Sequence, residues 1–227
     1  MDVMFACVAA GIGLFVASFL LGSIPWGVII SRVFYHTDIR EHGSGNIGTT
    51  NAMRTMGKAG GIAVFLLDFG KGIVAGVLAL VTLWLFVPGG GIGGDAPVSY
   101  DDFIGIAFLG CIWGHIFCPW FGWHGGKGIA VAVGCMLVTF GFVGALIELA
   151  IFVVVVFATR YVSAGSITAA VACPFLAAYY FLYADFAPLA FACCLIAAAT
   201  VVWAHRENIG RLRAGTESRV GAKKTEA

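Results

Sequence analysis

The sequence of 227 residues is 60% hydrophobic and 11% charged, with a mean hydropathy of +0.97. Soluble domains are about 45–50% apolar and about 25% charged, so this composition excludes an ordinary soluble enzyme, a disordered protein and a secreted disulfide scaffold. It predicts one integral membrane domain over residues 1–227, in which the positions of the charges matter more than their formal sum of +1.

Long intervals without a charged residue indicate where the chain crosses a membrane, because a spanning helix needs about 20 mostly apolar residues. In chain order these intervals are residues 3–31, 72–94, 103–126, 128–147, 149–159, 161–184 and 186–205. All except 149–159 are long enough to span. The sequence lacks the alternating apolar and polar segments of about 10 residues that are typical of a membrane β-barrel, so we expect an all-α helical bundle.

The distribution of lysine and arginine predicts the orientation of the bundle, because cytoplasmic loops are enriched in both. Basic residues follow the first interval and dominate the C-terminal tail: Arg32, Arg40, Arg54, Lys58, Arg206, Arg211, Arg213, Arg219, Lys223 and Lys224. The loop at residues 88–102 has no basic residue and carries Asp95, Asp101 and Asp102, so we expect it outside.

The number of spans depends on residues 128–159. A single helix there puts Arg160 and the basic tail outside. Two shorter tilted helices that turn near residues 141–148 return both to the cytoplasmic side, as the enrichment of basic residues there requires. We therefore predict seven transmembrane helices, with the N-terminus outside and the C-terminus cytoplasmic; five spans are the alternative. All 13 lysines and arginines then lie at the cytoplasmic face, and the outer acidic residues are Asp2, Asp95, Asp101, Asp102, Glu148 and Asp185.

Three further features bear on helix packing. Pro25 is expected to end or kink the first span near the inner face. Two small-residue patterns predict close helix contacts, Gly72 with Gly76 and Gly110 with Gly114. The seven cysteines show no metal-ligand spacing and are expected to be reduced core residues, so no metal site is predicted.

The first polar segment, residues 43–58, is rich in Gly, Ser, Asn and Thr. It matches GxGxxG, but no strand precedes it, so a dinucleotide fold is excluded. Small residues expose backbone N–H groups, and a helix beginning near Thr49 directs its positive end at an anion. Asn51 and Arg54 share one face of that helix. A tight glycine turn with solvated side chains is the alternative.

The second polar segment, residues 124–128, places three glycines around Lys127. It lacks the spacing of a Walker A loop, so an ATPase is not indicated. Backbone donors and one point charge favour a phosphate cradle. The alternative is a basic anchor in a tight turn at the inner face.

The third polar segment begins at His205 and continues into the basic tail. His205 and Asn208 are three residues apart and can face one site, and histidine is the usual general base near neutrality. The alternative is a basic tail attracted to anionic lipid. Asp68 and Lys71 add a charge pair, which belongs either to the site or to an ion pair that supports the fold.

The three segments share anion-binding donors and few carboxylates, and the sequence has neither a G-x-S-x-G elbow nor paired catalytic acids. These features predict a membrane protein that handles phosphorylated substrates at its cytoplasmic surface. A transporter is disfavoured because its polar groups usually lie near the membrane midplane. A lipid-binding scaffold explains the basic tail but not the clustered Ser44, Asn46, Asn51 and Lys127.

The polar segments closely resemble those of the PlsY family, the bacterial acyl-phosphate:glycerol-3-phosphate acyltransferases. The resemblance covers nearly the whole chain, in family order, at residues 22–25, 43–51 with Arg54 and Gly57, 125–128, 160–163, 205–209 and 211–217. It implies acyl transfer from acyl phosphate to the 1-hydroxyl of glycerol 3-phosphate. The products are lysophosphatidic acid and phosphate, in the first step of membrane phospholipid synthesis, and no metal or cofactor is required.

By motif position, the resemblance implies catalytic roles for His205, Ser44 and Lys127. It implies substrate-binding roles for Arg54, Asn208, Asn46, Thr50, Asn51, Gly45, Gly126 and Ser163. We expect His205 to contact the reacting hydroxyl; a substrate phosphate acting as base is the alternative. The expected partners are the two substrates and membrane lipids, with no nucleic acid. The expected setting is a monomer in the bacterial cytoplasmic membrane, with the site facing the cytoplasm.

Overall fold

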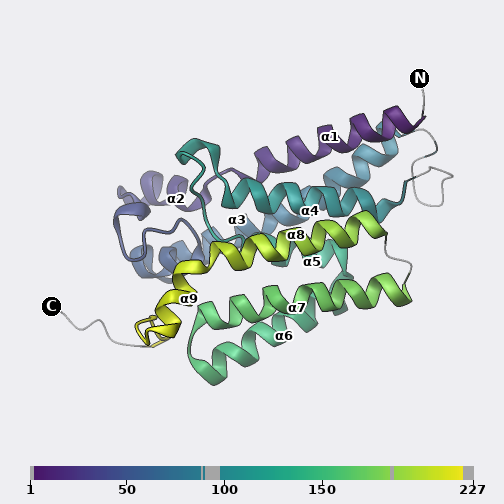
Figure 1. Cartoon of the computed structure of the whole chain (residues 1–227). Helices are drawn as coiled ribbons and strands as arrows, with labels where there is room; N and C mark the ends of the chain where they lie inside the picture. Colours follow the sequence, from purple (N-terminus) through teal and green to yellow (C-terminus); the bar gives the residue numbers. More distant parts are fainter. Residues whose placement is uncertain (1–2, 88, 90–97, 185–186, 222–227) are drawn as a thin grey trace.

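The computed structural model describes residues 3–87, 89, 98–184 and 187–221 (Figure 1). Within these ranges all regular structure is helical, which confirms the all-α prediction. The elements are α1 (Val3–Gly22), α2 (Trp26–Tyr35), η1 (Ile39–Glu41), α3 (Thr49–Phe86), α4 (Tyr100–Ile116), η2 (Pro119–Phe121), α5 (Ile129–Thr139), α6 (Gly141–Thr159), α7 (Val162–Tyr183), α8 (Pro188–Ala204) and α9 (Arg206–Arg213).

Helix α4 is the centre of the bundle and packs against α1, α3, α5 and α8. Helices α6 and α7 form a pair at one side, joined to the rest mainly through α7 against α8 and α5 against α6 (Figure 1). Five helical segments in the described ranges are long and apolar enough to cross a membrane, or six if the bent pair α8–α9 is one span. The chain is therefore a polytopic membrane protein.

Glycines let α1 and α4 approach until backbone touches backbone. A Cβ on Gly110 would lie 2.7 Å from the carbonyl oxygen of Phe15, and one on Gly114 would collide with the carbonyl of Phe19. In hydrocarbon, helices associate through such close van der Waals packing of small residues. Gly72 brings α3 onto the backbone of α5 in the same way, and Gly76 makes room for the Val138 side chain of α5. Both predicted glycine pairs are confirmed.

The first apolar interval is broken at the predicted proline. Helix α1 ends at Gly22, and α2 begins at Trp26, immediately after Pro25. Helix α3 begins at Thr49, as predicted, and contains a break at Gly57, where φ is +73°. These breaks place α2 and the start of α3 among the loops at one end of the bundle (Figure 1).

Residues 128–159 form two helices, as predicted, and the structure differs from the prediction only at Glu148. The chain turns at Gly141, at the start of the predicted range, where φ is +67°, because glycine tolerates this left-handed backbone. Glu148 therefore lies inside α6, and its side chain is buried instead of facing the outer surface. The prediction of an outer position for Glu148 is wrong.

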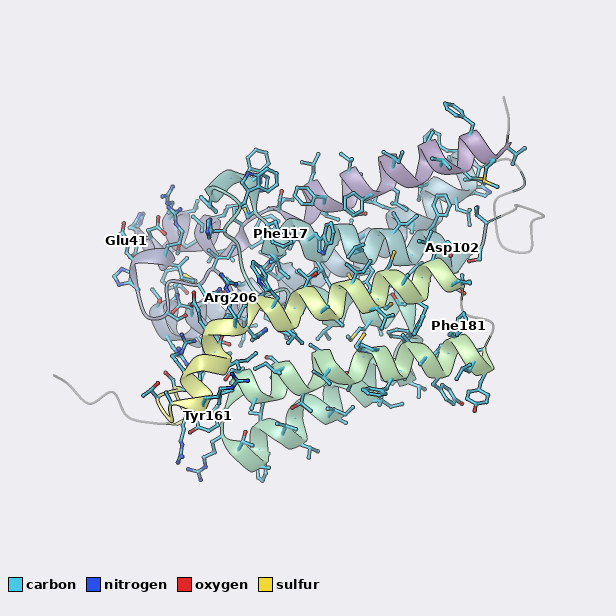
Figure 2. The ribbon with its side chains drawn as sticks, in the orientation of Figure 1. Glu41, Asp102, Phe117, Tyr161, Phe181 and Arg206 are labelled. Carbon is cyan, nitrogen blue, oxygen red and sulfur yellow. The ribbon has the colours of Figure 1, made fainter. Side chains whose placement is uncertain are left out.

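Charged side chains gather at one end of the bundle, here called the polar end, which comprises α2, η1, the start of α3, η2, residues 122–128 and α9. Glu41 and Arg206 lie there, whereas Asp102 lies at the opposite end (Figure 2). The predicted outer residues Asp2, Asp95 and Asp185 and the tail residues Lys223 and Lys224 lie outside the described ranges.

The α1–α4 contact yields a stability prediction. Gly114→Ala should lower the free energy of unfolding by about 1–3 kcal/mol, because the new Cβ must push the two helices apart. Gly13→Ala is the matched control: a Cβ there meets nothing within 4 Å, and alanine favours a helix. Thermal unfolding in detergent measures both variants, and equal midpoints for the two would contradict the packing argument.

Candidate active site

The three polar segments meet in one cavity of about 320 Å³ at the polar end. The first segment contributes Ser44, Gly45, Asn46 and Ile47, and the second contributes His124, Gly125 and Lys127. The remaining wall is formed by Arg40, Phe121, Glu207 and Arg211. Segments more than 150 residues apart in sequence thus form one site.

Asn51 organises the first loop. Its side chain is 1% exposed; its Nδ2 group lies within hydrogen-bond distance of the carbonyls of Ile39, His42 and Asn46, and its Oδ1 accepts the backbone N–H of Ser44. A buried amide satisfied in this way fixes the loop around it. Asn51 therefore positions Ser44 and Asn46 at the cavity, and its own polar atoms are occupied.

The glycine amides are occupied as well, which corrects one expectation. The N–H of Gly45 donates to His42 O, that of Gly125 to Ile116 O and that of Gly126 to His115 O. Each amide has a single proton and a backbone carbonyl already accepts it, so the prediction that these glycines offer free backbone donors is wrong. These three amides are therefore not available to an anion, and the cationic side chains are the candidate donors at the cavity.

Lys127 lies at the cavity wall among charges of both signs. Burial lowers the pKa of its ammonium, and the nearby Arg211 guanidinium lowers it further, while Glu217 and Glu207 act in the opposite direction. Arg54, exposed in the first turns of α3, adds a weaker repulsion. A partly desolvated cation beside other cations is stabilised by binding an anion, which relieves both penalties.

Arg40 is a wall residue that the sequence interpretation did not place in the site. Asp38 accepts two hydrogen bonds from its guanidinium, at 3.0 Å to Nε and 2.6 Å to Nη2, and its guanidinium carbon lies 4.3 Å from the centroid of the Phe121 ring. These contacts hold the guanidinium against the cavity. The sequence signal was weak because Arg40 resembled any other basic residue near the membrane surface.

His205 lies at the 51° bend between α8 and α9 and is 2% exposed. Its Nδ1 is 2.8 Å from the carbonyl oxygen of Val201, which can only accept, so Nδ1 carries the proton. Burial lowers the pKa of His205 to about 4, although the bond to Val201 opposes the shift. A neutral ring with Nδ1 protonated leaves the Nε2 lone pair available as a base.

Asn208 and Glu217 connect α9 to the tail behind the cavity. The Nδ2 of Asn208 donates to Glu217 Oε1 at 2.8 Å, and the Nε of Arg211 donates to Oε2 at 2.7 Å. Although burial favours the neutral form, these hydrogen bonds lower the pKa of Glu217. The Oδ1 of Asn208 is buried without a partner among the described residues, so it can accept a hydrogen bond from a ligand.

The predicted site residues differ in their position relative to the cavity. Four line the cavity: Ser44, Gly45, Asn46 and Lys127. Three are buried and do not line it: His205, Asn208 and Ser163. Arg54 and Thr50 are exposed in the first turns of α3, Asn51 holds the first loop, and Gly126 packs against the ring of His115. Arg40 and Arg211 were missed, although Arg211 lies in a segment of the family resemblance.

The sequence matches a family model described as glycerol-3-phosphate acyltransferase over residues 12–215. A glycerol-3-phosphate acyltransferase of Thermosynechococcus vestitus is 40% identical, covering 90% of this chain and 92% of that protein. One from Rhodopseudomonas palustris is 36% identical, covering 94% and 100%. One from Streptococcus thermophilus is 37% identical, covering 91% and 92%.

Two solved structures of PlsY, an integral membrane glycerol 3-phosphate acyltransferase, share the fold. Its glycerol 3-phosphate form has a TM-score of 0.76 and 32% identity, covering 93% of this chain and 96% of that one. Its lysophosphatidic acid form has a TM-score of 0.74 and 31% identity, covering 93% and 95%. Together with the family match over residues 12–215, these similarities show that the chain belongs to the PlsY family of integral membrane glycerol-3-phosphate acyltransferases.

Proposed function

We propose that the chain transfers a fatty acyl group from acyl phosphate to the 1-hydroxyl of glycerol 3-phosphate, giving lysophosphatidic acid and phosphate. The observation that carries this proposal is the cavity in which Lys127, Arg40 and Arg211 meet the polar side chains of the first loop. Both substrates are anions, and side-chain cations with few free carboxylates suit two phosphate groups in one site.

The residue roles follow from position. Lys127 and Arg54 bind phosphate oxygens, and Ser44 and Asn46 orient them from the opposite loop. The Oδ1 of Asn208 accepts a hydrogen bond from the second hydroxyl of glycerol 3-phosphate. The Nε2 of His205 takes the proton of the 1-hydroxyl as its oxygen attacks the acyl carbon and the donor phosphate leaves. Gly45, Gly126, Thr50, Asn51 and Ser163 shape the surrounding pocket.

An activated donor is consistent with this set of side chains. Phosphate is a good leaving group, so no covalent acyl-enzyme is needed, and the protein has to position the reactants and stabilise the developing oxyanion. In acyl phosphate the acyl carbon is already activated, and the donor phosphate is a second anionic group that Lys127 can bind. The acyl chain remains in the hydrocarbon beside the bundle while its phosphate reaches the polar end.

We also infer that the chain crosses the bacterial cytoplasmic membrane seven times, through α1, α3, α4, α5, α6, α7 and α8, with the polar end in the cytoplasm. Helix α1 begins at the end of the bundle opposite α9, which supports an odd number of crossings (Figure 1). The gathering of lysines and arginines at the polar end supports its cytoplasmic position. A monomer contains every residue of the proposed site.

The activity is tested with purified protein, acyl phosphate and radiolabelled glycerol 3-phosphate, and labelled lysophosphatidic acid is the expected product. Lys127→Ala and Arg54→Ala should each lower kcat/KM by about a hundredfold or more, because a positioned charge in the site is lost. Lys58→Ala is the matched control. Neither residue lines the cavity and both are exposed on α3, but Arg54 lies close enough to act on the charge of Lys127, whereas Lys58 lies beyond the break at Gly57.

Three outcomes would contradict the proposal. Acyl-CoA in place of acyl phosphate should give no product, so equal rates with both donors argue against the proposed donor. Uptake of glycerol 3-phosphate into proteoliposomes without product indicates a transporter. Wild-type turnover in Lys127→Ala removes this lysine from the site.

The base is identified by the pH dependence of kcat. A group whose folded pKa is depressed to about 4 stays neutral above that pH, so with His205 as base the acid limb lies well below pH 6. A substrate phosphate as base titrates near its own second pKa of about 6 and places the limb there. An acid limb near pH 6 that persists in His205→Ala would exclude His205 as the base.

The topology is tested by labelling introduced cysteines with a membrane-impermeant maleimide, since the seven native cysteines are buried. Asp101→Cys should react in intact spheroplasts, and Arg213→Cys only after permeabilisation. Phe142→Cys, next to the α5–α6 turn, should react from outside if the chain has seven spans. Its protection, with Asp101→Cys labelled, would favour five spans.

A further inference from the structure

Lys71 is a buried cation in α3 that the proposed reaction does not use. Its side chain is 2% exposed, and Nζ donates to the carbonyls of Gly22 at 2.9 Å and Ile24 at 3.0 Å. Asp68, one turn earlier, lies 2.8 Å from the same nitrogen. Lys71 therefore ties α3 to the break between α1 and α2.

The same ammonium reaches the centre of the bundle through His115 of α4. Lys71 Nζ lies 3.2 Å from His115 Nδ1, and because an ammonium only donates, Nδ1 accepts and the ring proton lies on Nε2. Nε2 faces Gly126: a Cβ built on Gly126 would collide with this atom. The ring of His115 is thus held by Lys71 on one side and supports the residue before Lys127 on the other.

The backbone of His115 holds the same loop. Its carbonyl oxygen accepts the N–H of Gly126 at 3.0 Å, and the next carbonyl, of Ile116, accepts that of Gly125 at 2.9 Å. From the other side of the junction, Cys118 Sγ donates to Ser23 O and Trp120 Nε1 to Ser23 Oγ. The α1–α2 junction and the loop of Lys127 are therefore parts of one hydrogen-bonded unit.

We propose that Lys71, His115 and Asp68 form a positioning cluster that sets the place of Lys127 in the cavity. This inference rests on the proposed function, in which Lys127 binds a substrate phosphate. It also explains two sequence features that have no role in the proposed reaction, the segment at residues 22–25 and the charge pair at residues 68 and 71.

The arrangement fits positioning better than stability alone. Removing a cation and a carboxylate from water is costly, and an apolar pair of the same size often supports a fold equally well. The imidazole ring is rigid and contacts the Lys71 ammonium on one side and Gly126 on the other, so it fixes the position of the loop relative to Lys71. Small displacements of a binding group change rates strongly, by up to about a hundredfold per ångström.

The test uses His115→Leu, which removes both the Nδ1 acceptor and the ring edge at Gly126, and His115→Asn, which loses the ring edge but keeps an acceptor near the place of Nδ1. His115→Leu should raise the KM for glycerol 3-phosphate about tenfold or more, with a smaller change in kcat, and His115→Asn should raise it less, by about threefold, because the contact with Lys71 is kept. Thr200→Val is the matched control: it removes the acceptor of Trp113 Nε1, also on α4, away from the loop.

A second readout does not depend on activity. Backbone hydrogen exchange of residues 119–130 should be faster in His115→Leu than in wild type. Without the ring between Lys71 and Gly126 the loop is held less firmly, so the backbone hydrogen bonds of Gly125 and Gly126 open more often. Unchanged exchange and unchanged KM in His115→Leu would overturn the proposal, as would equal losses in the Leu and Asn variants. A wild-type protein without transferase activity would refute the proposed function, while faster exchange in His115→Leu would still support positioning.

Gly126→Ala tests the contact from the opposite side if His115→Leu does not fold. The added methyl meets the His115 ring, so the loop must shift and the same rise in KM and in exchange rate is expected. Wild-type KM and exchange in this variant would contradict the proposal. A bundle that unfolds at the wild-type temperature shows that any effect is local to the loop.

Discussion

The exclusion of charge from hydrocarbon is the constraint on which the rest of this structure depends. Charged side chains are expensive within a bilayer, so the apolar helices leave most of them to the loops. At the polar end the loops after α2, before α5 and after α8 converge, and their cations become neighbours. The site is the place where charges that the membrane excludes are brought together.

The exceptions to this rule are informative. Asp68 and Lys71 are buried, but each has a partner, and Lys71 also satisfies two backbone carbonyls at the α1–α2 break. A proline break in a helix frees backbone acceptors that lipid cannot satisfy. The buried lysine fills this need and connects the break to α4. The same contacts of Lys71 thus stabilise the α1–α2 break and support the proposed positioning of Lys127.

Much of the fold could be predicted from the sequence because its signals are local. Charge-free intervals, Pro25 and the glycine pairs act through length, backbone geometry and side-chain size. The turn at Gly141 lies at the start of the predicted range, and only Glu148 was placed wrongly, because in a continuous apolar run nothing local marks where within that range a helix ends. Helix α5 is only 11 residues long, which no charge pattern reveals.

The candidate site was predictable in its residues and less so in its contacts. Polar residues that stand out in an apolar chain, such as Ser44, Lys127 and His205, identify themselves. The hydrogen-bond partner of each backbone amide depends on the tertiary structure, which the sequence does not show. The amides of Gly45 and Gly126 were therefore predicted to be free, although each donates to a backbone carbonyl. The place of Arg40 depends likewise on Asp38 and Phe121.

The central claim is that one cavity at the polar end binds the phosphate of glycerol 3-phosphate. An experimental structure of this chain with glycerol 3-phosphate bound tests it most directly. We expect the phosphate within hydrogen-bond distance of the Lys127 ammonium, beside Ser44, with the substrate hydroxyls directed toward His205 and Asn208. A phosphate bound elsewhere on the bundle, with Lys127 unliganded, would contradict it.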